Sequence, residues 1–237
     1  MSQSASLYLL HGALGCAADM TPLLEELNGQ LPGIALNFRG HGPDAASAAA
    51  FSIAAFAEDF LDAIATEPAP VDVFGYSMGG YVALYAAARQ PERIRRVFTL
   101  GTKLAWTPTT GEKEAGRLNP DVLAEKAPHF VELLARRHGP AWPEVVRKTA
   151  ALLRELGQTP DLGALPGDLG RAGIRAQVHI ARGELDRMVE EAECMEAVAG
   201  LPSAVYLQLP GQPHPFEQVD VKVLAGQLLG VWGKDRY

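Results

Sequence analysis

The sequence contains little cysteine, with only Cys16 and Cys194 in 237 residues. Two cysteines are too few for a disulfide framework, and these two do not have the spacing of metal ligands. We therefore expect two reduced thiols, with Cys194 on a helix, and no metal site.

Long apolar runs are also missing. No stretch approaches the roughly 20 apolar residues that a membrane-spanning helix requires. Residues 1–6 carry no basic side chain, and the apolar run that follows them is too short for a signal peptide. We therefore expect no membrane association and a cytoplasmic location.

Acidic residues outnumber basic ones: the sequence has 21 Lys and Arg and 28 Asp and Glu, for a formal net charge of −7. Nucleic-acid phosphates bind to basic surfaces, so this balance argues against nucleic acid as the main partner. With 48% hydrophobic and 21% charged residues, the composition is that of a soluble globular protein. The length favours one large domain, and we expect a monomer or homodimer that acts on a small-molecule substrate.

Short β-rich apolar runs alternate with helical patterns along most of the chain. This alternation predicts an α/β fold with a mainly parallel sheet of about six strands and helices on both faces. Right-handed crossovers bring the strand C-termini to one edge of such a sheet, where active sites lie. The expected strands are residues 7–10, 34–38, 71–74, 94–100, 176–181 and 204–209. The expected helices are residues 19–28, 53–65, 78–89, 189–199 and 216–229.

Residues 103–157 interrupt the alternation, because they contain no convincing strand. Asn119, Pro120 and Asp121 form a strong helix start, and the helix is expected to run to about His138. A second helix is expected over residues 143–157. We therefore predict a two-helix lid above the strand C-termini. The predicted division is a core of residues 1–102 and 158–237, with the lid at 103–157.

The most informative motif is Gly-Tyr-Ser-Met-Gly-Gly at residues 75–80, between a predicted buried strand and an alanine-rich helix. A serine at such a turn, in G-x-S-x-G, is typical of the nucleophile elbow of serine hydrolases. The sharp turn leaves little room for a Cβ atom at Gly75 and Gly79. It also holds Ser77 in a strained conformation that presents its hydroxyl. For the motif alone, the alternative is a glycine-rich turn with a spectator serine.

A serine nucleophile needs a base and an acid that orients the base. His214, in the loop after the last strand, is the candidate base. Asp186, after the strand at 176–181, is the candidate acid, and Glu184 is its nearest competitor. Asp186 could instead cap the helix that begins near Val189. The chain order serine, aspartate, histidine is that of the α/β-hydrolases.

The segment His-Gly-Ala-Leu-Gly at residues 11–15 follows the first strand and supplies the candidate oxyanion hole. The two predicted donors are the backbone N–H groups of Ala13 and Met78. We expect His11 to be a structural hydrogen-bonding residue. The remaining assignments place His129 and His138 on the lid surface or in lid packing, and His179 in the core.

Together these motifs resemble the α/β-hydrolase superfamily. They are HGALG at 11–15, RGHG at 39–42, GYSMGG at 75–80, GELD at 183–186 and GQPH at 211–214. In size and in GYSMGG the chain is similar to small carboxylesterases, thioesterases and the lyase that makes a succinyl-cyclohexadiene carboxylate in menaquinone synthesis. Two departures are the apparent absence of the family's leading antiparallel strands and Asn37, where many relatives carry aspartate.

The resemblance implies acyl transfer from a small-molecule ester or thioester to water, through a Ser-His-Asp triad and an acyl-enzyme, without a metal or organic cofactor. Two alternatives stay open. One is a lyase or C–C hydrolase that uses the same triad. The other is a non-catalytic small-molecule binder, because fold alone does not fix function.

The substrate pocket is expected between the core and the lid. Residues 103–157 carry nine Lys and Arg against seven Asp and Glu, which suggests an anionic group on the substrate. The alternative for Arg136 and Arg137 is a solvated helix end near the negative pole of the helix dipole. The aromatic residues of the lid could instead pack the lid helices against the core. The candidate pocket residues are Leu14, Tyr76, Trp106, Phe130 and Trp142.

Overall fold

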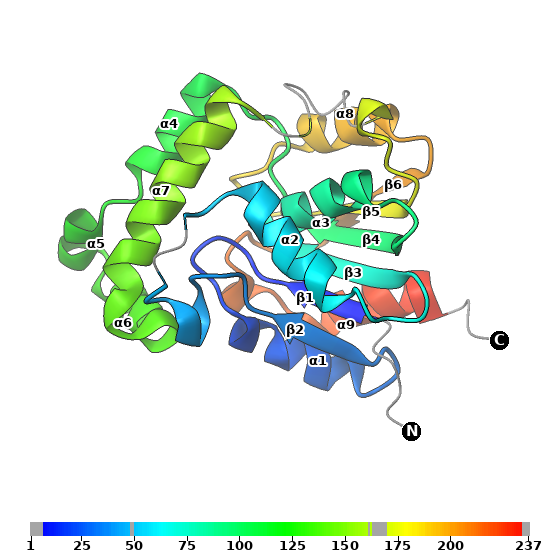
Figure 1. Ribbon diagram of the computed structural model, residues 1–237, viewed down its shortest axis with the longest axis horizontal. Helices are drawn as coiled ribbons and strands as arrows, with labels where there is room; N and C mark the ends of the chain where they lie inside the picture. Colours follow the sequence, from blue (N-terminus) through cyan, green and yellow to red (C-terminus); the bar gives the residue numbers. More distant parts are fainter. Residues whose placement is uncertain (1–6, 48–49, 161, 163–169, 234–237) are drawn as a thin grey trace.

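The computed structural model describes residues 7–47, 50–160, 162 and 170–233. Its centre is one six-stranded sheet in the order β2-β1-β3-β4-β5-β6, and every neighbouring pair is parallel (Figure 1). This confirms the predicted sheet. The strands are β1 (Leu7–Leu10), β2 (Gly33–Leu36), β3 (Val71–Tyr76), β4 (Ile94–Leu100), β5 (Gln177–Gly183) and β6 (Ala204–Leu209).

Helices cover both faces of the sheet (Figure 1). Helices α2, α3 and α8 pack on one face, and α1 and α9 pack on the other. Because both faces are covered, most of the strand side chains are apolar. The bounds of these helices are α1 (Thr21–Leu27), α2 (Ile53–Ala63), α3 (Met78–Arg89), α8 (Glu191–Gly200) and α9 (Val221–Trp232).

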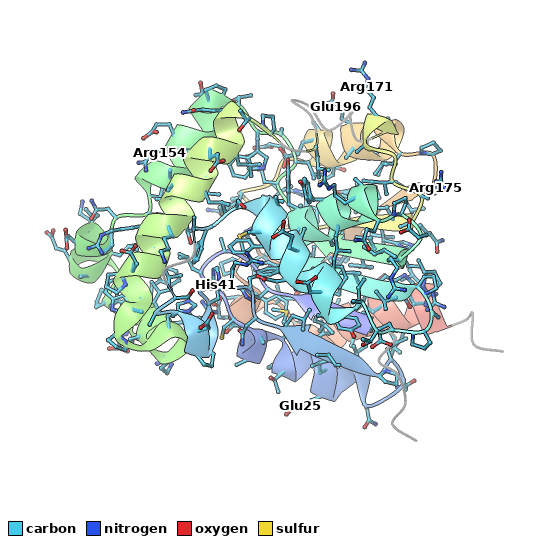
Figure 2. The ribbon with its side chains drawn as sticks, in the orientation of Figure 1. Glu25, His41, Arg154, Arg171, Arg175 and Glu196 are labelled. Carbon is cyan, nitrogen blue, oxygen red and sulfur yellow. The ribbon has the colours of Figure 1, made fainter. Side chains whose placement is uncertain are left out.

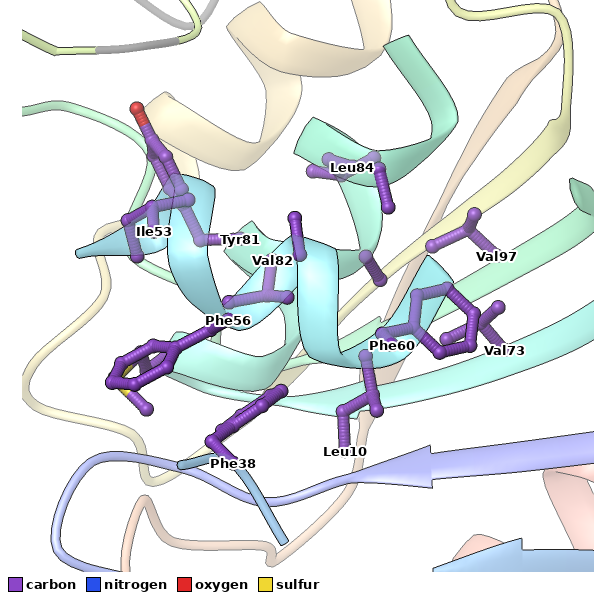
Figure 3. Packing of buried hydrophobic residues seen from close by; sticks show 14 of the residues in the cluster. Leu10, Phe38, Ile53, Phe56, Phe60, Val73, Tyr81, Val82, Leu84 and Val97 are labelled. Carbon is purple, nitrogen blue, oxygen red and sulfur yellow. The ribbon is translucent and has the colours of Figure 1, made fainter. Parts of the chain in front are cut away.

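The hydrophobic core is divided between the two faces, because successive side chains of a strand point in opposite directions. On one side, Leu10 and Val73 of the sheet meet Phe56 and Phe60 of α2, and all four are fully buried (Figure 3). On the other side, strand residues such as Leu9 pack against α1 and α9. The sheet is thereby fixed between two apolar layers, and its C-terminal edge becomes a rigid platform.

Two helix boundaries differ from the predictions near the ends of the chain. The expected helix 216–229 is a short 3₁₀ turn followed by α9, since Asp220 accepts hydrogen bonds from the N–H groups of Lys222 and Val223 and so caps α9. The expected helix 19–28 is a 3₁₀ turn at Ala17–Met20 followed by α1.

The segment 103–157, called the helical insertion below, contains four helices where two were predicted. Its helices are α4 (Pro108–Gly116), α5 (Pro120–Lys126), α6 (Pro128–His138) and α7 (Trp142–Gln158). Pro128 separates α5 from α6, because the residue before a proline avoids the α region and Ala127 has φ −139° and ψ 57°. Thr107 caps the unpredicted α4 by accepting a hydrogen bond from the N–H of Thr110.

Helices α4 and α7 cross with their backbones in contact. A Cβ atom on Gly111 would lie 2.7 Å from the Leu153 carbonyl oxygen, and one on Gly157 would lie 2.7 Å from the Thr107 carbonyl oxygen. The two glycines therefore allow the close approach of the helices. This paired unit lies beside the C-terminal edge of the sheet, to the left in Figure 1.

Candidate active site

Ser77 lies on the turn between β3 and α3 with φ 50° and ψ −115°, a conformation that costs a side-chain-bearing residue roughly 1–3 kcal/mol. Its N–H donates to the Leu100 carbonyl at 2.8 Å, and Thr102 donates to its carbonyl at 3.0 Å. A Cβ atom on Gly75 would lie 2.5 Å from the Gly79 carbonyl, and one on Gly79 would overlap the Leu10 carbonyl. The glycines of the motif are therefore required by the close packing of the turn.

A chain of side chains connects Ser77 to the loops after β5 and β6. The Ser77 Oγ lies 3.4 Å from His214 Nε2, and His214 Nδ1 lies 2.8 Å from Asp186 Oδ2. A carboxylate can only accept, so the His214 proton is on Nδ1 and Nε2 is free to accept from the serine. The Asp186 side chain is 1% exposed and that of His214 is 12% exposed, so the pair is shielded from water.

Asp186 also organises its own loop. Its Oδ1 accepts hydrogen bonds from the N–H groups of Met188 at 2.8 Å and Val189 at 3.1 Å. Oδ1 of Asp186 thus binds backbone N–H groups as a helix cap would. It does not cap α8 itself, because α8 begins only at Glu191. Burial raises the pKa of Asp186, but the His214 contact and these N–H donors outweigh burial and hold the pKa below its ordinary value.

The competitor Glu184 does not contact His214. Its carboxylate accepts from the N–H of Gly211 at 2.8 Å and so supports the loop that carries the histidine. Tyr76 also holds this loop in place, since its hydroxyl donates to the His214 carbonyl at 2.6 Å. The loop that carries His214 is thus tied to both β3 and the acid loop.

The candidate oxyanion loop, residues 11–15, turns back beside the elbow. The N–H of Gly15 donates to the Gly12 carbonyl at 3.1 Å, which closes a turn around Ala13 and Leu14. Leu14 has φ 61°, a left-handed conformation that is strained for leucine. His11 is structural, as expected. It is fully buried, and its Nε2 accepts from the N–H of Phe38 at 3.3 Å.

A cavity of about 320 Å³ lies above Ser77, between the core and the helical insertion. It is lined by Ser77 and His214 and by the predicted oxyanion residues Ala13 and Met78. Of the predicted pocket residues, it is lined by Leu14, Tyr76, Trp106 and Phe130.

The prediction for Trp142 does not hold, because this residue does not line the cavity. It begins α7 and packs, partly buried, against the core cluster. The part of α7 that lines the cavity lies further along the helix, at Leu152, Leu153 and Leu156. These three leucines were not among the predicted pocket residues. Their helical spacing was the available signal.

Arg137 is not the solvated helix end that was considered for it. Its side chain is 7% exposed, lines the cavity, and pairs with Asp19 at 2.9 Å and with Glu217. Asp19 follows the oxyanion loop, and Glu217 follows the histidine loop. Arg137 therefore connects the insertion to both sides of the site.

Comparison with known proteins identifies the family. A family model described as "alpha/beta hydrolase fold" matches residues 5–165. The chain belongs to this family. The matched stretch includes Ser77 and the oxyanion loop and ends before Asp186 and His214.

Two curated relatives of this α/β-hydrolase come from Neisseria meningitidis and are named pimeloyl-[acyl-carrier protein] methyl ester esterase. The protein of strain FAM18 is 31% identical over 186 residues, which are 76% of this chain and 66% of that protein. The protein of strain H44/76 is 32% identical over 171 residues, which are 70% of this chain and 60% of that protein. The aligned part of the hydrolase thus spans less than two thirds of either relative.

Solved structures agree in fold. The structure of MenH from S. aureus has a TM-score of 0.77 at 19% identity and covers 100% of this chain and 96% of that one. A thermophilic esterase from Thermogutta terrifontis has a TM-score of 0.74 at 17% identity and covers 96% and 89% of the two chains. At these identities the similarity shows that the hydrolase shares their fold.

Among the described residues of the hydrolase, no helix is both long and apolar enough to cross a membrane. The same residues contain no group of three or more His, Cys, Asp or Glu side chains that could hold a metal ion. Cys16 and Cys194 are free and buried, and Cys194 lies on α8, as predicted.

Gly101, directly after β4, packs against Asp186 and His214 and was missed by sequence reasoning. It has φ 63°, and a Cβ atom there would lie 3.1 Å from Asp186 Oδ2 and 3.2 Å from His214 Nδ1. A larger residue would therefore press on both side chains as well as strain the backbone. A glycine at the end of a buried strand was the only signal in the sequence.

We expect Gly101→Ala to lower kcat of the hydrolase by about tenfold to a hundredfold, because small displacements of catalytic groups have large effects on rate. Gly173→Ala is the matched control, since Gly173 also has a positive φ, of 78°, but has no neighbour within 4 Å of the added Cβ atom. Thermal unfolding and ester turnover of both variants separate backbone strain from displacement. Equal kcat values for the two variants would contradict the assigned role.

Three buried histidines lie close together: His11, which begins the candidate oxyanion loop, and His41 and His138 beside it (His41 is labelled in Figure 2). The His41 ring centroid lies 4.9 Å from that of His11 and 5.8 Å from that of His138. Burial lowers the pKa of His11 to about 4, and it lowers the pKa values of His41 and His138 below their ordinary range. All three are therefore neutral at pH 7.

Acidification is expected to lower the free energy of unfolding from about pH 6.5 downward. An unfolded histidine takes up its proton near pH 6.5, whereas these buried rings stay neutral to lower pH. The unfolded state then binds more protons, so each ring contributes up to ~1.4 kcal/mol per pH unit. Denaturant titrations between pH 7.5 and 5 measure this slope.

His41→Phe should make that slope shallower while keeping an aromatic ring in contact with Phe51. The Nε2 of His41 has no hydrogen-bond partner among the described residues. Removal of Nε2 therefore leaves no partner group without a hydrogen bond. His129→Gln, at a side chain that is 97% exposed, is the control and should leave the slope unchanged. A slope that is the same in His41→Phe and in the wild type would refute the explanation.

Proposed function

We propose that this α/β-hydrolase is a serine esterase or thioesterase that cleaves a small-molecule substrate through a Ser77–His214–Asp186 triad. One observation carries the proposal: the three side chains form a continuous chain with distances of 3.4 Å and 2.8 Å at the base of the cavity. Their order along the polypeptide, each following a different parallel strand, supports the same conclusion.

In the proposed reaction, His214 Nε2 takes the proton of the Ser77 hydroxyl as the Oγ attacks the carbonyl carbon. The carbonyl oxygen becomes an oxyanion, which the N–H groups of Ala13 and Met78 stabilise by roughly 3–4 kcal/mol per donor. His214 then gives its proton to the leaving alcohol or thiol. The acyl group remains on Ser77.

Water completes the proposed cycle. His214 takes a proton from a water molecule, whose oxygen attacks the acyl-enzyme, and a second oxyanion forms at the same N–H donors. When this intermediate collapses, the proton returns to the Ser77 oxygen and the carboxylic acid leaves. Asp186 holds the required tautomer of His214 throughout and stabilises the imidazolium cation.

The walls of the cavity support a substrate with an apolar acyl chain. Its lining includes Leu118, Phe130, Leu152 and Leu156 of the helical insertion and Tyr81 of the core. The curated relatives are named as methyl ester esterases of a pimeloyl group on a carrier protein. We therefore propose methyl esters of medium-length acyl chains as the first substrates to examine, both free and attached to a carrier.

Labelling with a fluorophosphonate, followed by a panel of esters and thioesters of increasing chain length, tests the proposal. We expect one label per chain on Ser77 and turnover that rises with chain length until the cavity is filled. Labelling without turnover of any member would replace hydrolysis by a lyase or C–C-cleaving reaction of the same triad. Absence of labelling would favour a binding protein without catalysis.

A further inference from the structure

The carbonyl oxygen of Leu14, in the oxyanion loop, is held by two consecutive residues of the helical insertion. Arg137 Nη1 donates to it at 3.3 Å, and His138 Nε2 lies 3.0 Å from it. These two residues end α6, and they are 123 and 124 positions away from Leu14. We propose that Arg137 and His138 are positioning residues that set the geometry of the oxyanion hole, an inference that rests on the proposed function.

The oxyanion loop is strained at Leu14. Leu14 has φ 61°, and a left-handed leucine persists only where its surroundings hold it. Its peptide lies inside the turn closed by Gly15 and Gly12, and the proposed donor Ala13 is the preceding residue. Because the Leu14 carbonyl shares its peptide group with the Gly15 N–H, rotation of that carbonyl would break the bond to Gly12 and open the turn that holds Ala13.

The hydrogen bonds of His138 fix the position of its ring proton. The N–H of Gly42 donates to His138 Nδ1 at 3.1 Å, so Nδ1 carries no proton. The proton of the neutral ring is then on Nε2, which donates to the Leu14 carbonyl. His138 is 3% exposed, and the groups that face it are His11 and His41 from the core loops, Arg137 on its own helix, and Asp19.

The Arg137 side chain is held in place by two carboxylates. Its Nε donates to Asp19 Oδ1 at 2.9 Å, while Asp19 Oδ2 accepts from the N–H of Cys16 at 2.9 Å. A second carboxylate, of Glu217, binds the other side of the guanidinium. Arg137 therefore holds both the Leu14 carbonyl and the segment that follows the oxyanion loop.

The arrangement connects the insertion to the chemistry. The same helix that supplies Phe130 to the cavity wall also fixes the loop that stabilises the oxyanion. A shift of α6 away from the core would break the bonds to Leu14 and disorganise the oxyanion hole. The hydrolase is then fully competent only while the insertion is docked.

The test compares His138→Phe, which removes the donor, with His138→Gln, whose amide can still donate to Leu14. His138 does not line the cavity, so we expect His138→Phe to lower kcat about tenfold to a hundredfold with KM changed less than threefold. Affinity for a trifluoromethyl ketone, which forms a tetrahedral oxyanion adduct, should fall by a similar factor. His138→Gln should recover most of both losses.

Arg137→Met is the second variant, for the case that His138→Phe does not fold, and Arg136→Met is its matched control. Arg136 is the neighbouring cation of α6, and it is exposed. We expect Arg137→Met to lower kcat at least tenfold and Arg136→Met to leave it unchanged. Wild-type kcat in folded His138→Phe or Arg137→Met, or failure of His138→Gln to restore the rate, would overturn the inference.

Hydrogen exchange of residues 11–16 separates this inference from the proposed function, because it does not depend on activity. Faster exchange of these amides in His138→Phe and Arg137→Met than in Arg136→Met is expected. If the wild type hydrolyses no ester but exchange accelerates, the proposed function fails and the attachment of the loop stands. If exchange is unchanged in both variants, the attachment itself is refuted.

Discussion

Replacement of Ser77 by alanine is expected to lower kcat for a short p-nitrophenyl ester by about 10⁶-fold, to the background of the remaining site. The variant removes the hydroxyl that faces His214 at 3.4 Å. The strained turn is kept, because its glycines and its bonds to Leu100 and Thr102 do not involve that hydroxyl. Thermal unfolding should therefore be nearly unchanged.

Ser203→Ala is the control for the Ser77 variant. This serine also loses a hydroxyl, which donates to the Ala176 carbonyl away from the cavity. Its ester turnover should match the wild type. Turnover by purified Ser77→Ala within tenfold of the wild type would remove Ser77 as the nucleophile and, with it, the proposed function.

The second large effect is expected at the acid. Asp186→Asn should lower kcat by about 10⁴-fold, because an amide can donate to His214 Nδ1 and so place the imidazole proton on Nε2, where it cannot accept from Ser77. The loss should be largely in kcat, since Asp186 is buried behind the histidine and does not line the cavity. Steady-state kinetics with one ester measure it.

Glu184→Gln is the matched control, because it makes the same change from carboxylate to amide two residues earlier. Its side-chain oxygen can still accept from the N–H of Gly211. We expect activity within about threefold of the wild type. A larger loss in Glu184→Gln than in Asp186→Asn would exchange the roles of the two carboxylates.

Much of the fold could be predicted from local sequence. The strands at 7–10, 94–100 and 204–209 have the predicted bounds, because each is a short β-rich segment dominated by apolar residues. The candidate triad could be predicted as well, since parallel strands bring their C-terminal loops to one edge. Its catalytic role stays a prediction that the variants above address.

The rest depended on contacts between distant segments. Local sequence did not reveal that Pro128 divides the predicted helix in two. A proline can interrupt a helix or begin one, and Pro128 ends the stretch of α5 and begins α6. Arg137 appeared solvated because Asp19 and Glu217, which bury its charge, are 118 and 80 positions away. The contacts of Gly101 with Asp186 and His214, and of His138 with Leu14, likewise join segments that are far apart in the sequence.

The glycine crossing of α4 and α7 has a consequence for how this fold could diversify. Where backbones touch at Gly111 and Gly157, no change of rotamer can widen the gap between the helices. Every descendant that keeps both glycines inherits the same spacing. Adaptation to bulkier or slimmer substrates then proceeds by exchanging wall side chains such as Leu152 and Leu156, while the surrounding frame is retained.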